Sequence, residues 1–276
     1  MTLRAVYTFF GYYFTLLMFG LFGLAQSFVS LVAGVLPASP ATEWFFQRMV
    51  HRNFALFIWW TTFAQLFDVH YHGIERIPKG RRGLVLAANH PSLTDITCLL
   101  ARLPEAICIF KPAIRRNPVL GAGARRAGYL ASDGGLDVLR RAADKVAAGH
   151  TLIVFPEGTR TPPGTSLLPL KPGFVLIARR AGVAIQLVRI TCSRPVLAKG
   201  RAWWKMPPLP ARADIEVGPL IEVPSTAKTG DILATIDAWF RTPAKASVAA
   251  CATAPGPLFS PIRSFTFVPR SNTSGR

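Results

Sequence analysis

A long uncharged stretch opens the chain. No charged residue lies between Arg4 and Glu43, and residues 5–36 are mainly Phe, Leu, Val, Tyr and Gly. About 20 apolar residues are enough to span the hydrocarbon core of a bilayer, so this stretch is long enough to cross one. A cleaved signal peptide is the competing interpretation, but its apolar core is only ~7–15 residues long.

A second helix is expected directly afterwards. Residues 43–52 are amphipathic and basic, whereas residues 53–67 are again uncharged and include Trp59 and Trp60. The second uncharged run is short for a membrane span, but a tryptophan pair suits the headgroup belt of a membrane. Residues 1–67 are therefore predicted to form two helices that span a membrane or lie in it. The alternative is a buried helix pair packed on the rest of the chain.

From Asp68 onward, short apolar runs alternate with amphipathic ones. Helical spacing is clearest at residues 136–148, and Gly149 can end that helix. Strands are predicted at 69–73, 83–88, 106–110, 152–155, 183–190 and 214–217, and helices at 96–103, 136–148, 174–181 and 231–240, with a turn at 78–80. This alternation predicts an α/β domain over residues 68–242, with a mixed, largely parallel sheet covered by helices.

The last part of the chain has no such pattern. Residues 243–276 show no periodicity and are rich in Ala, Pro and Ser. A segment of this composition cannot bury enough apolar surface to offset the entropy of ordering it. We therefore expect a disordered tail.

Polar residues follow two of the predicted strands, and the first group is Asn89 to Asp95. His90 comes just after the apolar run 83–88, and Asp95 lies five positions later. The carboxyl edge of a sheet is where open α/β proteins bind ligands. A nearby carboxylate can fix the tautomer of a histidine and stabilise its protonated form. Alternatively, Asp95 is the N-cap of the helix expected from Ile96.

The second group follows the strand 152–155 and reads Pro156-Glu157-Gly158-Thr159-Arg160. Glycine permits a close approach of the backbone to a ligand, and arginine offers a planar fork for a phosphate or carboxylate. Taken alone, this segment could equally be a turn with a surface ion pair.

Together the two groups resemble the glycerolipid acyltransferase family, the enzymes similar to 1-acyl-sn-glycerol-3-phosphate acyltransferase. His90 and Asp95 match the first family motif, a histidine and an aspartate separated by four residues. Phe155 to Arg160 match the third motif, Phe-Pro-Glu-Gly-Thr-Arg, at every position. The resemblance covers residues 68–240.

The resemblance implies a membrane-associated O-acyltransferase of phospholipid biosynthesis. Its co-substrate would be acyl-coenzyme A or acyl-carrier protein, and it would need no cofactor and no metal. The acceptor would be a lysophospholipid-like hydroxyl, with 1-acyl-glycerol-3-phosphate as the default. His90 would be the general base, oriented by Asp95. Glu157, Gly158, Thr159 and Arg160 would bind the acceptor, and Lys111 lies in the region of the second motif.

Two departures from the family pattern concern the acceptor. The second motif usually ends in an aspartate followed by arginine, but Asp133 is followed by Gly134. The fourth motif usually contains a proline, and residues 183–188 contain none. An acceptor with another head group, in a specialised lipid pathway, is therefore the alternative to lysophosphatidic acid.

The charge balance points to an anionic partner. The formal net charge is +18, and residues 158–213 contain ten Lys and Arg but no acidic residue. Such a field attracts membrane phospholipid, coenzyme A, an acidic carrier protein or nucleic acid. The sequence has neither zinc-finger spacing nor an RNP-type aromatic motif, which argues against nucleic acid. The basic residues Arg48 and Arg52 beyond the first apolar run predict the inner membrane, with the catalytic domain on its cytoplasmic face.

Other functions fit the sequence less well. The four cysteines show no metal-type spacing and are expected to be free thiols. A serine lipid hydrolase would need a Gly-x-Ser-x-Gly elbow, and none occurs. A non-catalytic lipid-binding protein would not require the pairing of His90 with Asp95.

Overall fold

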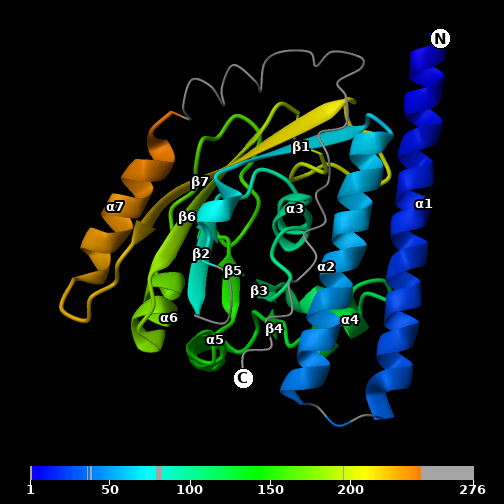
Figure 1. Ribbon diagram of the computed structural model, residues 1–276. Helices are drawn as coiled ribbons and strands as arrows, with labels where there is room; N and C mark the ends of the chain where they lie inside the picture. The colour runs from blue at the N-terminus through cyan, green and yellow to red at the C-terminus, as the bar shows by residue number, and fades with distance from the viewer. Residues whose placement is uncertain (1, 36, 38, 79–82, 195, 244–276) are drawn as a thin grey trace, which may run out of the picture.

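The computed structural model describes residues 2–35, 37, 39–78, 83–194 and 196–243. Two long helices, α1 (Leu3–Val32) and α2 (Pro40–Phe63), stand side by side next to an α/β domain (Figure 1). A short 3-10 turn, Ala33–Val35, ends α1. Ser39 begins α2 with a capping box, because its Oγ accepts from the backbone N of Thr42 (3.2 Å) while Thr42 Oγ1 accepts from the backbone N of Ser39 (2.9 Å).

The domain is built on a seven-stranded sheet with the order β1-β7-β6-β2-β5-β3-β4. Strands β6 and β7 pair antiparallel, and every other neighbouring pair is parallel. The strands are β1 (Phe67–His72), β2 (Leu84–Ala88), β3 (Ala106–Phe110), β4 (Leu130–Ala131), β5 (Thr151–Val154), β6 (Ile185–Cys192) and β7 (Ala211–Ile221). The predicted mixed, largely parallel sheet is therefore confirmed.

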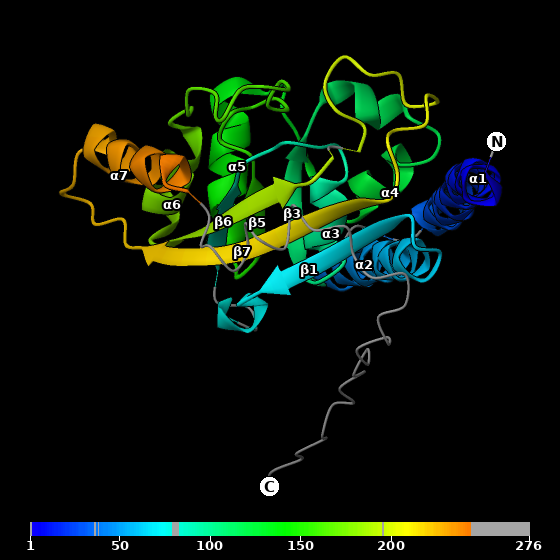
Figure 2. The same cartoon turned by 90° about the horizontal axis from the view of Figure 1, so that it is seen from above.

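Helices cover both faces of the sheet, as the view from above shows (Figure 2). Strand β2 explains why: Leu84, Leu86 and Ala88 pack with α2 and α3, whereas Val85 and Ala87 pack with α5, α6 and α7. A strand that is buried on both faces needs apolar residues at consecutive positions, and the sequence of β2 has them. The helical elements of the domain are η2 (Ile74–Arg76), α3 (Asp95–Leu100), η3 (Pro112–Arg116), α4 (Gly121–Arg126), α5 (Gly135–Ala147), α6 (Gly173–Ala181) and α7 (Thr229–Arg241).

Helix α2 is fastened to the domain by polar contacts. Lys145 Nζ lies 2.7 Å from Glu43 Oε2, and Gln47 Nε2 donates to the carbonyl of Ala127 (3.0 Å). His51 Nδ1 lies 2.9 Å from the carbonyl oxygen of Leu100. The basic stretch 43–52, predicted as amphipathic, therefore turns part of its polar face to the protein.

Helix α1 lies outermost, and it buries mainly small polar residues while it exposes large apolar ones. The buried residues of α1 are Thr8, Tyr12, Thr15, Ser27 and Ser30. Its exposed face carries large apolar side chains along its whole length, among them Leu3, Phe10, Leu17, Leu21, Phe28 and Leu31. Among the described residues, one helical segment, Leu3–Val35, is long and apolar enough to cross a membrane.

The structure differs from the sequence-based expectation in several details. Strand β7 runs over residues 211–221, well beyond the predicted 214–217, because its pairing with both β1 and β6 continues there. The short elements η3, α4 and β4 were not predicted, since pieces of two to six residues are too short to show a period. Apart from Pro78 and Pro243, the predicted turn at 78–80 and the predicted tail lie outside the described residues.

Candidate functional site

The loop after β2 carries His90 to the carboxyl edge of the sheet, and Asn89 fixes its start. The Asn89 side chain donates to the carbonyl of Ile190 (2.9 Å) and accepts from the backbone N of the same residue (2.6 Å). This amide thus replaces the backbone pairing with β6 at the point where β2 ends. The sequence analysis included Asn89 in the motif but gave it no role, although a polar residue at the end of an apolar strand was a usable signal.

His90 and Asp95 face each other within that loop. His90 Nδ1 lies 2.9 Å from Asp95 Oδ2, and the same oxygen accepts from the backbone N of Ser92 (2.7 Å). Asp95 is 1% exposed, and this burial raises the pKa of its carboxyl group against the lowering effect of both hydrogen bonds. With Nδ1 engaged by the carboxylate, Nε2 is the ring nitrogen that can accept a proton.

Asp95 does not act as the cap that the sequence left open. It is the first residue of α3, and the N-cap position belongs to Thr94, which makes no side-chain capping bond. The carboxylate of Asp95 instead turns back to Ser92 and His90. Its helix therefore serves to hold the carboxylate at the imidazole.

Glu157 joins the two motif loops. Its buried carboxylate accepts from the backbone N of His90 (3.0 Å), from Thr161 Oγ1 (2.8 and 2.9 Å) and from the backbone N of Leu168 (3.0 Å). A second link is the bond from the backbone N of Thr161 to the carbonyl of His90 (2.8 Å). Both oxygens of Glu157 are thus occupied by the protein, and the residue is not among those that line the adjoining cavity.

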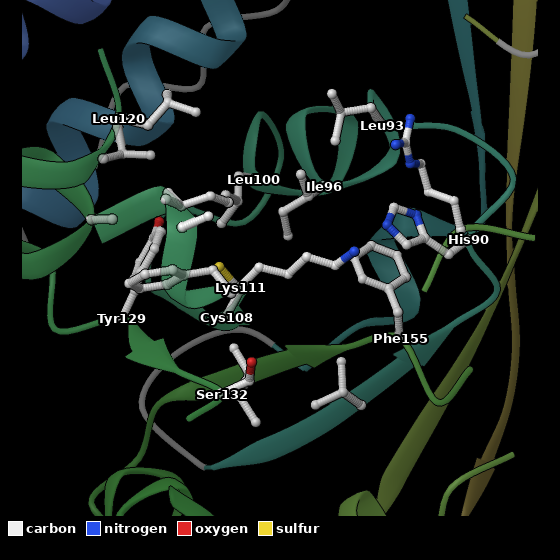
Figure 3. A pocket seen from close by; sticks show the side chains of 18 of the residues that line it. His90, Leu93, Ile96, Leu100, Cys108, Lys111, Leu120, Tyr129, Ser132 and Phe155 are labelled. Atoms are coloured by element: carbon white, nitrogen blue, oxygen red, sulfur yellow. The ribbon is translucent and has the colours of Figure 1, made fainter. Parts of the chain in front are cut away.

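The cavity has a volume of about 550 Å³ and reaches from His90 to the helix pair. Figure 3 shows His90 and Phe155 at one end and Leu120 with Tyr129 at the other. The His90 ring stacks on Phe155 with centroids 3.9 Å apart. Most of the lining is apolar, and α1 and α2 contribute to it through Phe19, Phe22, Gly23, Gln26, Val50, Asn53, Phe54 and Phe57.

Cationic side chains lie on the His90 side of the cavity. Of the predicted binding residues, Lys111, Gly158, Thr159 and Arg160 line it. The Lys111 side chain extends across the cavity toward Phe155 and His90 (Figure 3). Arg160 lies at the cavity wall and donates through Nη1 to the carbonyls of Leu197 and Ala198.

Lys171 is a further lining residue, which the sequence analysis missed. It lies against Gly158, where the backbone φ is +68° and a Cβ atom would stand 2.7 Å from Lys171 Nζ. Glycine at this position both permits the left-handed backbone and leaves room for the ammonium group. A lysine directly before the Pro-Gly start of α6 gave no usable signal in a chain this basic.

Asp133, which closes the second motif, lies just beyond β4. Its carboxylate pairs with Arg115 Nη1 at 3.3 Å, and both side chains are about half exposed. Arg116 and Arg125 line the same shallow hollow. The neighbourhood of Asp133 is therefore strongly basic although the residue after it is a glycine.

The thiols are poor candidates for a nucleophile. Cys98, Cys108 and Cys192 are free, and burial raises the pKa of each thiol, that of Cys108 to about 12. A protonated, buried thiol is not nucleophilic at neutral pH. Within the described residues, no group of three or more His, Cys, Asp or Glu is arranged to hold a metal ion.

Comparison with known proteins adds independent findings. Residues 68–191 match the family model described as Acyltransferase. The chain is 33% identical over 130 residues to a 1-acyl-sn-glycerol-3-phosphate acyltransferase of Helicobacter pylori, covering 45% of this chain and 54% of that protein. It is 36% identical over 119 residues to a lyso-ornithine lipid O-acyltransferase of Pseudomonas aeruginosa, covering 41% of this chain and 45% of that protein. The chain thus spans about half the length of these curated relatives.

A solved structure has a similar fold over most of the chain. The crystal structure of the 1-acyl-sn-glycerophosphate acyltransferase PlsC from Thermotoga maritima superposes with a TM-score of 0.67. The match covers 91% of this chain and 97% of that chain at 24% sequence identity. At this identity the likeness establishes the fold.

Proposed function

We propose that this chain is a membrane-associated enzyme of the glycerolipid acyltransferase family, which transfers a fatty acyl group from a thioester to a hydroxyl of a lysolipid. The match of residues 68–191 to the Acyltransferase family model supports this proposal. The observation that carries the proposal is the contact of His90 Nδ1 with Asp95 Oδ2, 2.9 Å, at the end of a largely apolar cavity. It combines a proton acceptor with room for an acyl chain.

In the proposed reaction, His90 Nε2 removes the proton from the acceptor hydroxyl as its oxygen attacks the thioester carbonyl carbon. The carbon–sulfur bond then breaks, and the leaving thiolate takes the proton back from His90. Asp95 keeps the imidazole in the required tautomer and stabilises its protonated form. No covalent acyl-enzyme is needed, which agrees with the buried, protonated cysteines.

The fatty acyl chain would occupy the cavity between the domain and the helix pair. Phe19, Phe22, Phe54 and Phe57 form apolar walls there, and burying each methylene group stabilises the complex by ≈ 0.8 kcal/mol. Near the helices the cavity also meets a polar contact, in which Asn53 Nδ2 donates to Gln26 Oε1. The apolar walls support a lipid rather than a small polar substrate.

The head group of the acceptor would be anionic. Lys111, Arg160 and Lys171 line the cavity, and no acidic side chain among the described residues shares that lining. Gly158 and Thr159 would let the acceptor approach the backbone, whereas the bonds of Glu157 favour a role in joining the two loops. Lysophosphatidic acid remains the default acceptor.

A second acceptor is favoured by one observation. The arginine expected after Asp133 is absent, and Asp133 pairs instead with Arg115. Losing one phosphate ligand weakens the case for a phosphomonoester head group and favours an acceptor with another head group. The relative named lyso-ornithine lipid O-acyltransferase shows that a similar domain serves a different acceptor.

The membrane is proposed as the site of the reaction. The exposed face of α1 is apolar along its length, and a lipid environment would cover this face. The basic residues of the chain favour an anionic leaflet, and the inner membrane with the domain on its cytoplasmic face remains the proposed location.

The test is a panel of acceptors given to the full chain in lipid vesicles. Lysophosphatidic acid, lyso-ornithine lipid and other lysolipids are each combined with labelled acyl-coenzyme A or acyl-carrier protein, and the products are identified by mass spectrometry. His90→Ala should lower the turnover with the best acceptor by ~10²–10⁴-fold. The matched control is His70→Ala, because His70 pairs with Asp68 (2.6 Å) in a partly exposed position on β1. Equal activity of wild type and His90→Ala would refute the mechanism.

A further inference from the structure

The loop between β6 and β7 connects the candidate site with helix α1. We name residues 196–210 the strap. At one end, Ser92 Oγ donates to the carbonyl of Val196, and Arg160 Nη1 donates to the carbonyls of Leu197 and Ala198. The strap is therefore bonded to both loops that hold His90 and Glu157.

Further along, the strap is bonded to the outer helix. Tyr12 Oη of α1 donates to the carbonyl of Trp203 (2.7 Å), and Tyr13 Oη donates to the carbonyl of Trp204 (3.0 Å). Because the backbones of both tryptophans are held in this way, their position along α1 is fixed. Figure 1 shows this loop, in yellow, beside α1 and α2.

The side chains of the two tryptophans point outward. Trp203 is 60% exposed and Trp204 is 56% exposed, and their rings meet edge to face with centroids 5.6 Å apart. An indole ring is large and apolar with one polar N–H, so it is stabilised where an apolar phase meets water. Two adjacent indole rings that stay fully exposed to water would be less stable than the same rings at such a boundary.

The charged side chains of the strap, which flank the tryptophan pair, are all basic. Lys199, Arg201 and Lys205 lie in the strap, and residues 158–213 contain no acidic side chain. Arg201 bonds to the carbonyls of Lys205 and Met206, which curls this part of the strap around its tip. Aromatic rings at the centre and cations beside them are complementary to a membrane surface that contains anionic lipid.

The pair also continues an apolar surface. Phe9, Phe10 and Phe14 are exposed on the part of α1 to which the strap is bonded through Tyr12 and Tyr13. A membrane that covers this part of α1 therefore also meets the strap. The exposed tryptophans and the exposed helix face form one surface rather than two.

We propose that the strap is a second membrane-contact element, in which Trp203 and Trp204 lie at the headgroup level of an anionic phospholipid bilayer. Since the strap is bonded to Arg160 and Ser92, this contact also holds the site at the lipid surface, where a lysolipid acceptor enters. The second statement rests on the proposed function, whereas the first does not.

The position of the tryptophans is tested by fluorescence quenching. The full chain is placed in vesicles of phosphatidylethanolamine and phosphatidylglycerol that contain phosphatidylcholine brominated either near the glycerol or near the chain end. The fluorescence of the double variant Trp203→Phe/Trp204→Phe is subtracted from that of wild type. We expect the difference to be quenched by the shallow bromines and much less by the deep ones. A difference that neither lipid quenches would overturn the proposal.

Trp239→Phe is the matched control for this measurement. Trp239 lies on α7, packs against Arg189 and contacts Gly218. Figure 1 places α7 on the far side of the sheet from α1, so the fluorescence that this variant loses should not be quenched by either lipid. Quenching of the Trp239 component as strongly as that of the strap would show that the signal is unspecific, and the assignment of the strap would fall.

The link to the site is tested by kinetics. Trp203→Ala/Trp204→Ala should lower the rate on a vesicle-embedded acceptor by about tenfold, an estimate from the loss of two interfacial anchors. The rate on a short-chain, water-soluble acceptor of the same class should change less than twofold, which is the scale of an uninvolved surface site. Leu136→Ala, an exposed apolar residue on α5, should change neither rate.

The outcomes separate the two proposals. Equal losses on both acceptors would show that the strap acts on the site without the membrane, and a tryptophan-dependent oligomer in the vesicles would show that a second copy covers the pair. Either result overturns the inference. If wild type acylates no acceptor, the proposed function fails, while the quenching result still decides where Trp203 and Trp204 lie.

Discussion

The candidate site and helix α1 both reverse the usual distribution of residues, in opposite directions. At the site, Asp95 and Glu157 are 1% and 3% exposed, although carboxylates are rarely buried. On α1, Phe10 and Phe28 are 66% and 68% exposed, while the residues that face the protein include serine and threonine. The buried carboxylates and the exposed apolar side chains must each be stabilised by other interactions.

The compensation at the site is a set of hydrogen bonds within the domain. Asp95 and Glu157 accept from backbone and side-chain donors that belong to the two motif loops. On α1, Thr8, Thr15 and Ser30 donate to the carbonyl four residues earlier, so these three hydroxyl groups are satisfied within the helix. The comparison teaches that the site is stabilised from within, whereas nothing in the described residues covers the exposed apolar face of α1, which the proposed membrane would cover.

The largest expected effect tests the internal compensation at Asp95. Asp95→Asn keeps the shape of the side chain but removes the charge that stabilises a protonated His90. Turnover should fall by about 10²–10⁴-fold, the range for loss of an effective general base. Steady-state kinetics in vesicles measure this. Partitioning into the vesicles serves as the control, because the proposed membrane contact is made by α1 and should not change. A turnover within threefold of wild type would contradict the assigned role.

The next effect concerns Glu157 as a joint between the two loops. Glu157→Ala leaves the backbone N of His90 and of Leu168 without their acceptor. Each unsatisfied buried donor costs about 1–3 kcal/mol. The free energy of unfolding should therefore fall by at least the cost of one such donor. Denaturant unfolding in detergent micelles measures it. Glu222→Ala, at an exposed position, is the control and should stay within about 0.5 kcal/mol of wild type.

A smaller effect tests the contact of α1 with the domain. A Cβ atom at Gly23 would stand 2.9 Å from the carbonyl O of Val119 and would collide with the side chain of the same residue. Gly23→Ala should therefore destabilise the protein by about 1–3 kcal/mol through overpacking. At Gly20 nothing lies within 4 Å of such an atom, so Gly20→Ala should instead stabilise α1 by roughly 0.5–1 kcal/mol. Thermal unfolding that shifts in the same direction for both variants would contradict this difference.

The smallest expected effect is the pH dependence that Asp95 gives to stability. Burial raises the pKa of Asp95 in the folded protein above the unfolded value of about 3.9. The folded state then binds the proton more tightly, so this stabilisation is complete below the unfolded pKa and is lost as pH rises through the folded pKa. Asp95→Asn lacks this loss, and its stability relative to wild type should increase as pH rises above about 4. Denaturant unfolding across a pH series measures the difference, and a constant value would contradict the raised pKa.

The sequence predicted those parts of the fold whose pattern is local. The buried run at β2 and the helical spacing of α5 both produce a signal within a few residues, and both elements are present. The length of β7 was underestimated because it follows from partners on two other strands, β1 and β6. The short elements η3 and α4 were missed because the contacts of α4 with α1 and with η3 position them, not their own periodicity.

At the site, the sequence identified chemical groups better than their surroundings. The spacing of His90 and Asp95 predicted a pair, and the structure brings the two side chains into contact. The bonds of Glu157 to both loops could not be foreseen, because Leu168 and His90 are far apart in the sequence. Gln26 and Asn53, which meet beside the cavity, also come from separate helices, and no local pattern indicates such a contact.

The pairing of β1 with β7 bears on the order in which the chain can fold. Phe67 stands opposite Ala211, so the strand that follows α2 waits for its partner until most of the protein has been synthesised. Strand pairing between such distant segments is slow, and an unpaired strand edge invites wrong contacts. In the proposed membrane-bound enzyme, helices α1 and α2 precede this step and would meet the bilayer while the ribosome is still adding the rest. The membrane would then hold one end of the growing domain in place, and β7 would close the sheet onto a strand that is already anchored.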